Sequence, residues 1–167
     1  MSHNVSMKGI PLKDMRMLDK ALKELNADYG TKFVLKVGAV ASRNYQRTHV
    51  IPNTIAVIHD PSLSYDLSIQ RDPKTNEYSV QGEALLIGTL IDKFQIRKAR
   101  NVETKQDVDL SQVGYRRNEQ LGIQAMIGPI AQRYAACVLE QQAAVSGKTV
   151  QRSFNKDTNV LSVTISH

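Results

Sequence analysis

The stretch GPIAQRYAACVLEQQAAVSGKTVQRSFNKDTNVLSVTIS, from Gly128 to Ser166, decides the fold. Pro129 suits the first position of a helix, and Gly147 suits the residue that ends one. Between them, side chains recur at helical spacing at Ile130, Tyr134, Val138, Gln141 and Val145. Residues 149–155 and 160–166 then alternate polar and apolar side chains, which predicts a β-hairpin. The helix and the hairpin each have an apolar face that must be buried, so we expect the two to form a unit that packs through these faces.

The residues before this unit predict a sheet and further helices. An amphipathic helix is expected at 12–25, with a stripe made by Met15, Leu18, Leu22 and Leu25. Strands are expected at 32–40, 54–59, 65–70 and 78–82, with a short extended segment near Val5 and Met7 and a helix at 83–94. Strands with such short connections pair antiparallel.

The fold class that follows is α+β. It is an antiparallel sheet, a meander plus the C-terminal hairpin, with two or three helices packed on one face. The 167 residues predict one domain, in which 95–120 form a polar insertion or arm. Residues 121–127 either precede the last helix or begin it, and in the second case Gly128-Pro129 makes a kink.

Composition and missing motifs narrow the function. The single cysteine, Cys137, cannot form an internal disulfide and is expected to be a structural thiol. No signal peptide and no membrane-spanning run is recognisable, so we expect a soluble protein of the cytoplasm, or of a host cytoplasm if the protein is viral. No phosphate-binding glycine loop, zinc-ligand pattern or nucleophile elbow is present, so neither an enzyme nor a bound metal or cofactor is predicted. His59-Asp60 resembles a base and its orienting carboxylate, but strand neighbours point to opposite faces.

The positive features are basic residues interleaved with aromatic ones. The net charge is +6, and it is segregated: residues 54–92 carry two basic and six acidic side chains, whereas 93–117 carry seven basic and three acidic. Such segregation is typical of a polyanion-binding face. The predicted nucleic-acid-binding residues are Arg43, Tyr45, Arg47, Arg97, Lys98, Arg100, Tyr115, Arg116, Arg117, Lys148 and Arg152.

These residues fall into three clusters along the sequence, at 43–49, 94–117 and 148–156. On an extended backbone, Arg43, Tyr45, Arg47 and His49 would share one face, although 42–53 also suits a hairpin loop. Phe94 precedes the second cluster, while Lys148, Arg152 and Phe154 share one strand face of the third. Solvated loops and strand faces are the alternative for every cluster.

Several segments together resemble a family of conserved hypothetical chloroplast and cyanobacterial reading frames that also has phage members. The resemblance rests on Met1-Ser2-His3 and the helix after it, Tyr65-Asp66-Leu67, Tyr78-Ser79-Val80, Gln132-Arg133-Tyr134-Ala135 and the closing hairpin. The chain departs from the family at Gly82-Glu83-Ala84, where the family places an acidic residue with a tryptophan, and 95–120 look like an insertion. The resemblance implies an outline of the fold and no site residues.

The charge pattern also resembles small basic phage proteins that bind single-stranded DNA and assist a phage RNA polymerase. We therefore expect a non-enzymatic, single-stranded-DNA-binding protein of transcription or replication. Its partners would be single-stranded DNA, an RNA polymerase and further copies of itself, with no membrane. The alternative is a protein–protein adaptor or inhibitor that binds a host or phage protein, for example by strand addition.

Overall fold

The fold is built on a five-stranded antiparallel sheet. The computed structural model describes residues 4–45, 47–100, 104–110, 119–155, 157–158 and 160–166. The strands of the sheet are β1 (Asn4–Lys8), β2 (Val34–Val37), β5 (Thr54–His59), β6 (Leu67–Arg71) and β7 (Tyr78–Glu83). Their order is β1-β7-β6-β5-β2, and each neighbouring pair is antiparallel. The predicted meander is confirmed, with the N-terminal strand added outside β7.

Three two-stranded ribbons complete the β structure. They are β3 (Ser42–Arg43) with β4 (Thr48–His49), β8 (Lys98–Arg100) with β9 (Asp107–Asp109), and β10 (Thr149–Asn155) with β11 (Val160–Ser166). The last of these is the hairpin expected from alternation. The middle one lies within the polar insertion.

The first helix, α1 (Met15–Tyr29), begins and ends through capping. Asp14 lies just before it and accepts hydrogen bonds from the backbone N–H groups of Arg16 and Met17. Gly30 ends it with a φ of 69°, the left-handed conformation in which a helix C-terminus favours glycine. Asp14 is therefore the N-cap, and the helix starts three residues later than the expected residue 12. α2 (Ala84–Lys93) follows β7 directly.

The last helix, α4 (Glu119–Val145), continues through Pro129 without ending there. The expectation that Pro129 opens the helix is wrong, and the alternative of an earlier start is confirmed. Proline has no N–H, so the carbonyl of Ala125 lacks its usual helical donor. The preceding residue is Gly128, whose missing Cβ relieves the clash that a helical residue before proline otherwise meets.

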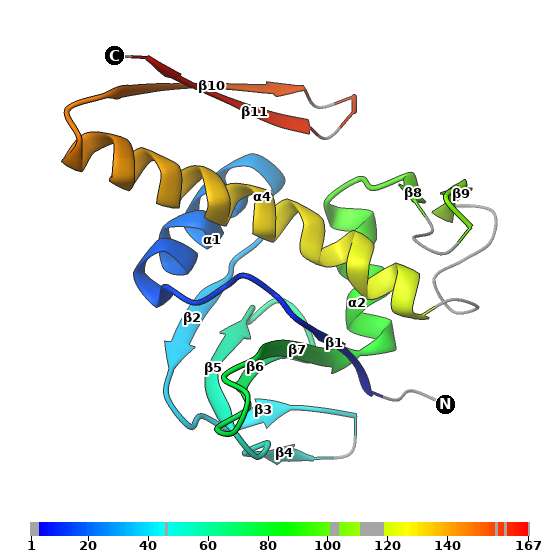
Figure 1. The fold of residues 1–167 in the computed structure, drawn as a ribbon. Helices are drawn as coiled ribbons and strands as arrows, with labels where there is room; N and C mark the ends of the chain where they lie inside the picture. The colour runs from blue at the N-terminus through cyan, green and yellow to red at the C-terminus, as the bar shows by residue number, and fades with distance from the viewer. Residues whose placement is uncertain are drawn as a thin grey trace.

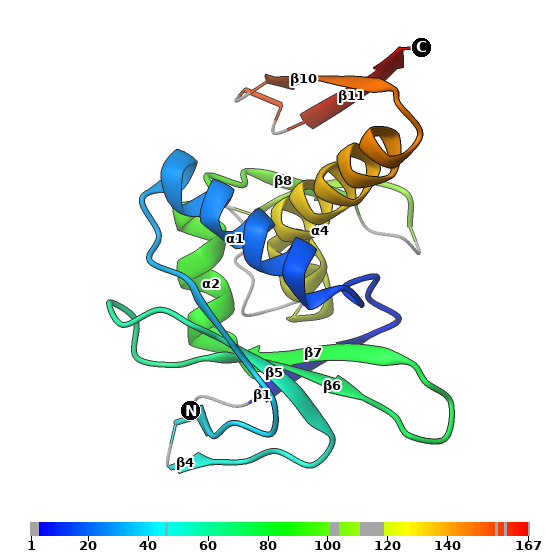
Figure 2. The same cartoon turned by 90° about the vertical axis from the view of Figure 1, so that its left-hand side faces the viewer.

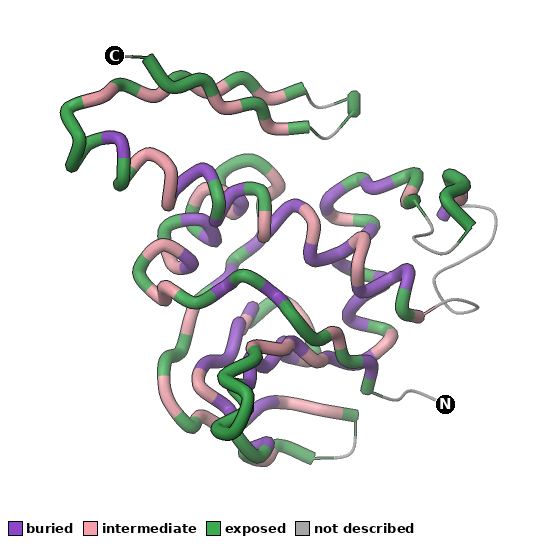
Figure 3. Tube along the Cα trace, viewed as in Figure 1, coloured by how far each residue is buried: buried purple, intermediate pink, exposed green. Residues whose placement is uncertain are grey.

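The helices form a layer between the sheet and the hairpin β10–β11. Figures 1 and 2 show α1, α2 and α4 over one face of the sheet, with the hairpin on the far side of α4. Figure 3 shows that buried segments concentrate in this layer and in the central strands. The core includes Leu18 and Leu22 of α1, Ile69 of β6, and Met126 and Ile130 of α4. Among the described helices, none combines the length and apolar character needed to cross a membrane.

Gly82 of β7 is a point of close approach to Leu67 of the neighbouring strand β6. A Cβ at this position would lie 2.6 Å from Cδ2 of Leu67, which is itself 1% exposed. We predict that Gly82→Ala lowers the free energy of unfolding by about 1–3 kcal/mol through overpacking. Urea denaturation measures this change.

The double variant Gly82→Ala/Leu67→Ala provides the control. Leu67→Ala alone costs about 2–5 kcal/mol by leaving a cavity. That cavity accepts the added methyl group, so the two changes should cost less together than the sum of their separate costs. If the two stability losses simply add, the close contact between residue 82 and Leu67 is contradicted.

Candidate functional site

The first predicted cluster lies on a hairpin and not on one extended face. Ser42 pairs with His49 and Arg43 with Thr48 across β3 and β4, and the N–H of Asn44 donates to the carbonyl of Arg47. Residues opposite each other on paired strands share a face, and successive residues alternate. Arg43 and His49 therefore point to opposite sides. The prediction of a single face was wrong because the chain turns back between them.

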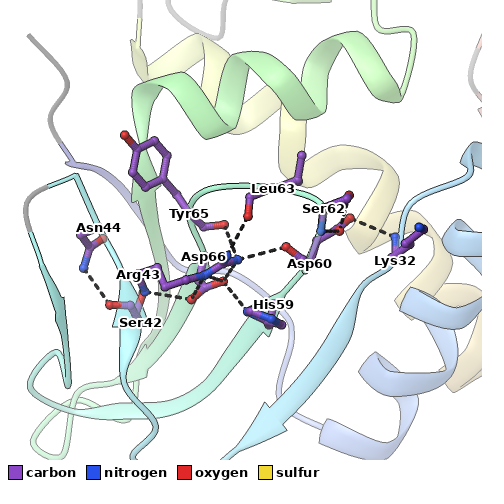
Figure 4. A network of polar contacts seen from close by, with 10 residues as sticks. All are labelled: Lys32, Ser42, Arg43, Asn44, His59, Asp60, Ser62, Leu63, Tyr65 and Asp66. Atoms are coloured by element: carbon purple, nitrogen blue, oxygen red, sulfur yellow. Dashed lines mark hydrogen bonds and ion pairs between the residues drawn. The ribbon is translucent and has the colours of Figure 1, made fainter.

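Arg43 is an internal structural residue of this region. Its guanidinium donates to both carboxylate oxygens of Asp66, with Nη2–Oδ1 at 2.7 Å, and its backbone N–H donates to Oδ2 at 2.8 Å. The same guanidinium also donates to the carbonyls of Leu63, Asp60 and Tyr65. Figure 4 shows these contacts converging on the Arg43 guanidinium, beside Asp66. The Arg43 guanidinium is therefore held within the fold by Asp66 and three backbone carbonyls, and its role in nucleic-acid binding stays a prediction.

Asp66 also orients a histidine. Nδ1 of His59 lies 2.9 Å from Oδ1 of Asp66, whose side chain is 2% exposed. Burial alone would raise the pKa of Asp66, but the hydrogen bonds from Arg43 and His59 outweigh burial and hold that pKa below its usual value. The carboxylate that orients His59 is thus Asp66 and not its neighbour Asp60. Nothing in the sequence indicated this pair, which spans the turn between β5 and β6.

A polar layer lies beside this network. Four buried side-chain atoms have no hydrogen-bond partner among the described residues: Ser42 Oγ, His49 Nδ1, Ser68 Oγ and Gln70 Nε2. Ser68 and Gln70 point from the same face of β6, the face opposite to the core residues Leu67 and Ile69. The ribbon β3–β4 lies on this second face of the sheet, away from the helices (Figures 1 and 2). The exposed Tyr45 and Arg47 belong to the ribbon's turn and so lie on that side too.

Arg152 of the C-terminal cluster also points toward the helices. Arg152 forms ion pairs with Glu24 of α1 and Glu140 of α4, and its Nη2 lies 3.6 Å from Sγ of Cys137. Burial alone would lower the pKa of Arg152, but the hydrogen bonds that its guanidinium donates to these carboxylates raise that pKa. Arg152 and Phe154 share a strand face, as predicted, but that face packs on the helices. The Arg152 guanidinium is therefore engaged in the fold.

A second arginine reinforces this junction. Arg133 of α4, which is 7% exposed, forms a 2.6 Å ion pair with Asp28 of α1 and lies 4.8 Å from the ring centroid of Phe154. This single side chain connects two helices and the hairpin. Lys148, between α4 and β10, is half-buried.

The second predicted cluster lines an open cleft of about 810 Å³. One wall is the segment 95–100, which contains Arg97, Lys98 and Arg100, all three exposed. The floor is the first half of α4, and the turn of the C-terminal hairpin closes one end. The remaining lining residues are Met7, Leu121, Gln124, Ala125, Gly128, Pro129, Gln132, Asp157, Thr158 and Val160.

The cleft combines cations with an apolar floor and amide groups. Gln124 and Gln132 present side-chain amides, and the Ala125 carbonyl lacks its helical donor because Pro129 follows four residues later. Two aspartates of β9 partly neutralise the cations of β8. Lys98 pairs with Asp109 and Arg100 with Asp107, and Nε of Arg100 lies 3.3 Å from Oδ1 of Asp107. Both partners in that ion pair are mostly exposed, so it contributes little to stability and can yield to a stronger anion.

The remaining predictions are limited by what the structure describes. Tyr115, Arg116 and Arg117 lie outside the described residues, and Phe94 is a core residue, 1% exposed, that packs edge-on against Tyr29. Across the described ranges, no three His, Cys, Asp or Glu side chains are grouped so as to hold a metal ion. Among the described residues the predicted cations therefore separate: the cleft gathers Arg97, Lys98 and Arg100, whereas Arg43, Arg47, Lys148 and Arg152 are not part of its lining.

Comparison of the chain with protein-family models, with curated proteins and with solved structures gives no match in any of the three. The resemblance to the chloroplast and cyanobacterial family stays a prediction. Function is therefore argued from the geometry of the chain itself.

Asp66 gives a test of the buried network. We predict that Asp66→Asn lowers the free energy of unfolding at pH 7 by about 1.5–3 kcal/mol, the worth of hydrogen bonds to a charged group. Because the folded-state pKa is depressed, the stabilisation is present above the unfolded pKa of about 3.9 and is lost as pH falls through the folded value.

The pH dependence separates this effect from a general loss of stability. Between pH 7 and pH 3 the wild-type protein should lose more stability than Asp66→Asn, as measured by urea denaturation. Asp92→Asn, a change at an exposed position on α2, serves as the control and should behave like the wild type. Equal acid sensitivity of wild type and Asp66→Asn would contradict the role assigned to Asp66.

Cys137 gives a second test. Burial raises the pKa of this thiol to about 11, helped by its 2.9 Å hydrogen bond to Glu24. The thiolate is the reactive form, so native protein at pH 8 should react with a thiol reagent such as Ellman's only as fast as it opens. Denatured protein should react at once, and rapid labelling of the folded chain would contradict the buried environment.

Proposed function

We propose that the chain is a non-enzymatic protein that binds single-stranded DNA in the cleft between β8, α4 and the turn of the C-terminal hairpin. The observation that carries the proposal is the juxtaposition of three exposed cations, Arg97, Lys98 and Arg100, with an apolar floor. Cations neutralise phosphates, and an apolar surface accepts the faces of unstacked bases. The role proposed for this binding lies in transcription or replication.

A single strand fits this site better than a duplex. Base faces that could contact Ile96, Ala125 or Val160 are available only when bases are unstacked. Reading a duplex by its major groove takes a helix or ribbon with exposed base-contacting side chains. α4 has one basic residue, Arg133, and it is buried against Asp28 and Phe154.

The amide groups add hydrogen-bonding capacity without adding charge. Gln124 and Gln132 offer both donors and acceptors, and the Ala125 carbonyl offers an acceptor. None of these groups requires one particular base. The proposal is therefore binding with weak sequence preference, in which phosphate contacts supply most of the affinity.

Fluorescence anisotropy with labelled single-stranded and duplex DNA of equal sequence, across a salt series, tests the proposal. The wild-type protein should bind the single strand more tightly, with affinity falling steeply as salt rises. In the triple variant Arg97→Gln/Lys98→Gln/Arg100→Gln, the log–log salt slope should become shallower by about 2, because each phosphate neutralised on a single strand contributes about 0.7.

Two controls isolate the cleft from net charge. Lys36→Gln/Arg71→Gln/Lys74→Gln removes the same charge from exposed positions outside the cleft and should leave the slope nearly unchanged. Asp107→Asn removes the carboxylate opposite Arg100 and should tighten binding. Equal losses in both triple variants would show that charge alone drives binding. No binding to any oligonucleotide at low salt would overturn the proposal and leave a protein partner as the function to test.

A further inference from the structure

The hairpin β10–β11 leaves the outer edge of β11 open. In an antiparallel pair, backbone groups point alternately to the partner strand and away from it. The N–H of Leu161 donates to Oε1 of Gln132 and so points away from β10. By alternation, the N–H and carbonyl groups of Val163 and Ile165 point outward as well. Apart from this bond to Gln132, no backbone hydrogen bond among the described residues joins the edge to another segment.

This edge lacks the features that protect the other edges of the molecule. Edge strands are protected by charged side chains, inward-pointing charges, short length, bulges or proline. β1 carries Lys8, β2 has four residues and carries Lys36, and β10 carries the inward-pointing Arg152. β11, with the sequence VLSVTIS, has seven residues and no charge, proline or glycine.

We propose that β11 pairs antiparallel with β11 of a second copy of the chain, about a two-fold axis at Val163, to make a four-stranded sheet across two molecules. This register lays Leu161 opposite Ile165 of the second copy and Ser162 opposite Thr164 of the second copy. All seven residues of the strand are then paired. The residues whose backbone groups point outward meet one another, as a hydrogen-bonded antiparallel ladder requires. In this pairing the N–H of Leu161 exchanges Oε1 of Gln132 for the carbonyl of Ile165 of the second copy.

The side chains fit this symmetric pairing. Leu161, Val163 and Ile165 alternate onto the face that packs toward the helices, and Ser162 and Thr164 onto the solvent face. Each face of the joined sheet thus continues with like chemistry from one copy into the other. Ile165 is 44% exposed in the single chain. Pairing places Leu161 of the second copy beside it.

Charge also favours association of two copies through this edge rather than through another surface. Each chain carries a net charge of +6, so two copies repel wherever their basic surfaces meet. β11 is a neutral strand, which brings no like charges together. An isologous contact also closes on itself, so it yields a dimer and not a fibre.

Sedimentation equilibrium of the full chain, from nanomolar to high micromolar concentration, tests the proposal. The wild-type protein should dimerise reversibly. Ser162→Lys with Thr164→Lys places lysine opposite lysine twice across the two-fold axis and should raise the dimer dissociation constant by about tenfold or more. Both positions are exposed and lie opposite the neutral Ser153 and Gln151 within the hairpin, so the thermal midpoint of the monomer should hold.

A charge-swapped variant identifies the register. Ser162→Glu with Thr164→Lys carries two substitutions at the same positions but places glutamate opposite lysine in the symmetric pair, so it should restore dimerisation. A wild-type protein that stays monomeric at high micromolar concentration overturns the proposal. So does a double-lysine variant that dimerises normally, or a glutamate–lysine variant that is equally monomeric. Binding of single-stranded DNA by monomeric variants is measured separately, so the two proposals fail independently.

Discussion

The structure depends on covering α4 from more than one side. Its buried residues, among them Ile123, Met126, Ile130 and Cys137, occupy most of its circumference, so one neighbouring layer cannot remove them all from water. α1 and the sheet cover one side, and the hairpin β10–β11 covers another. The hydroxyl of Tyr134 extends this contact by accepting hydrogen bonds from the backbone N–H groups of Lys13 and Asp14, where α1 begins. The sheet, both long helices and the hairpin therefore hold one another in place through α4.

Arginine side chains fasten the outer elements to this centre. The planar guanidinium satisfies several acceptors at once, which suits it to junctions where segments converge. Arg43 fixes the ribbon β3–β4 to the β5–β6 turn, and Arg152 with Arg133 fixes the hairpin to the helices. Two of the arginines predicted to bind a polyanion, Arg43 and Arg152, are thus engaged within the fold. Among the described residues, the predicted cations that face solvent beside the cleft are Arg97, Lys98 and Arg100.

Periodicity predicted the strands and helices well because each has a near-continuous apolar face. β5 lies where alternation and flanking turns placed it, and α1 follows its leucine stripe. α4 was misjudged at its start, since Pro129 favours a first helical position locally while tertiary cover sustains the helix on both sides of it. The site was harder, because a cation's role depends on partners far along the chain. Asp66 follows Arg43 by 23 residues and Glu24 precedes Arg152 by 128, separations that no local pattern records.

The pairing of α1 with α4 also has a consequence for synthesis. The ribosome makes α1 early, but its packing partner begins at Glu119, ninety residues after α1 ends at Tyr29. At about 5–20 residues per second, the nascent chain waits roughly 5–20 s before that partner emerges. During this interval the strands of the sheet and α2 are made, but α4 is not there to cover the apolar stripe of α1. Native packing of α1 is therefore a late event, and chains that stop before α4 present part of this stripe to chaperones or to one another.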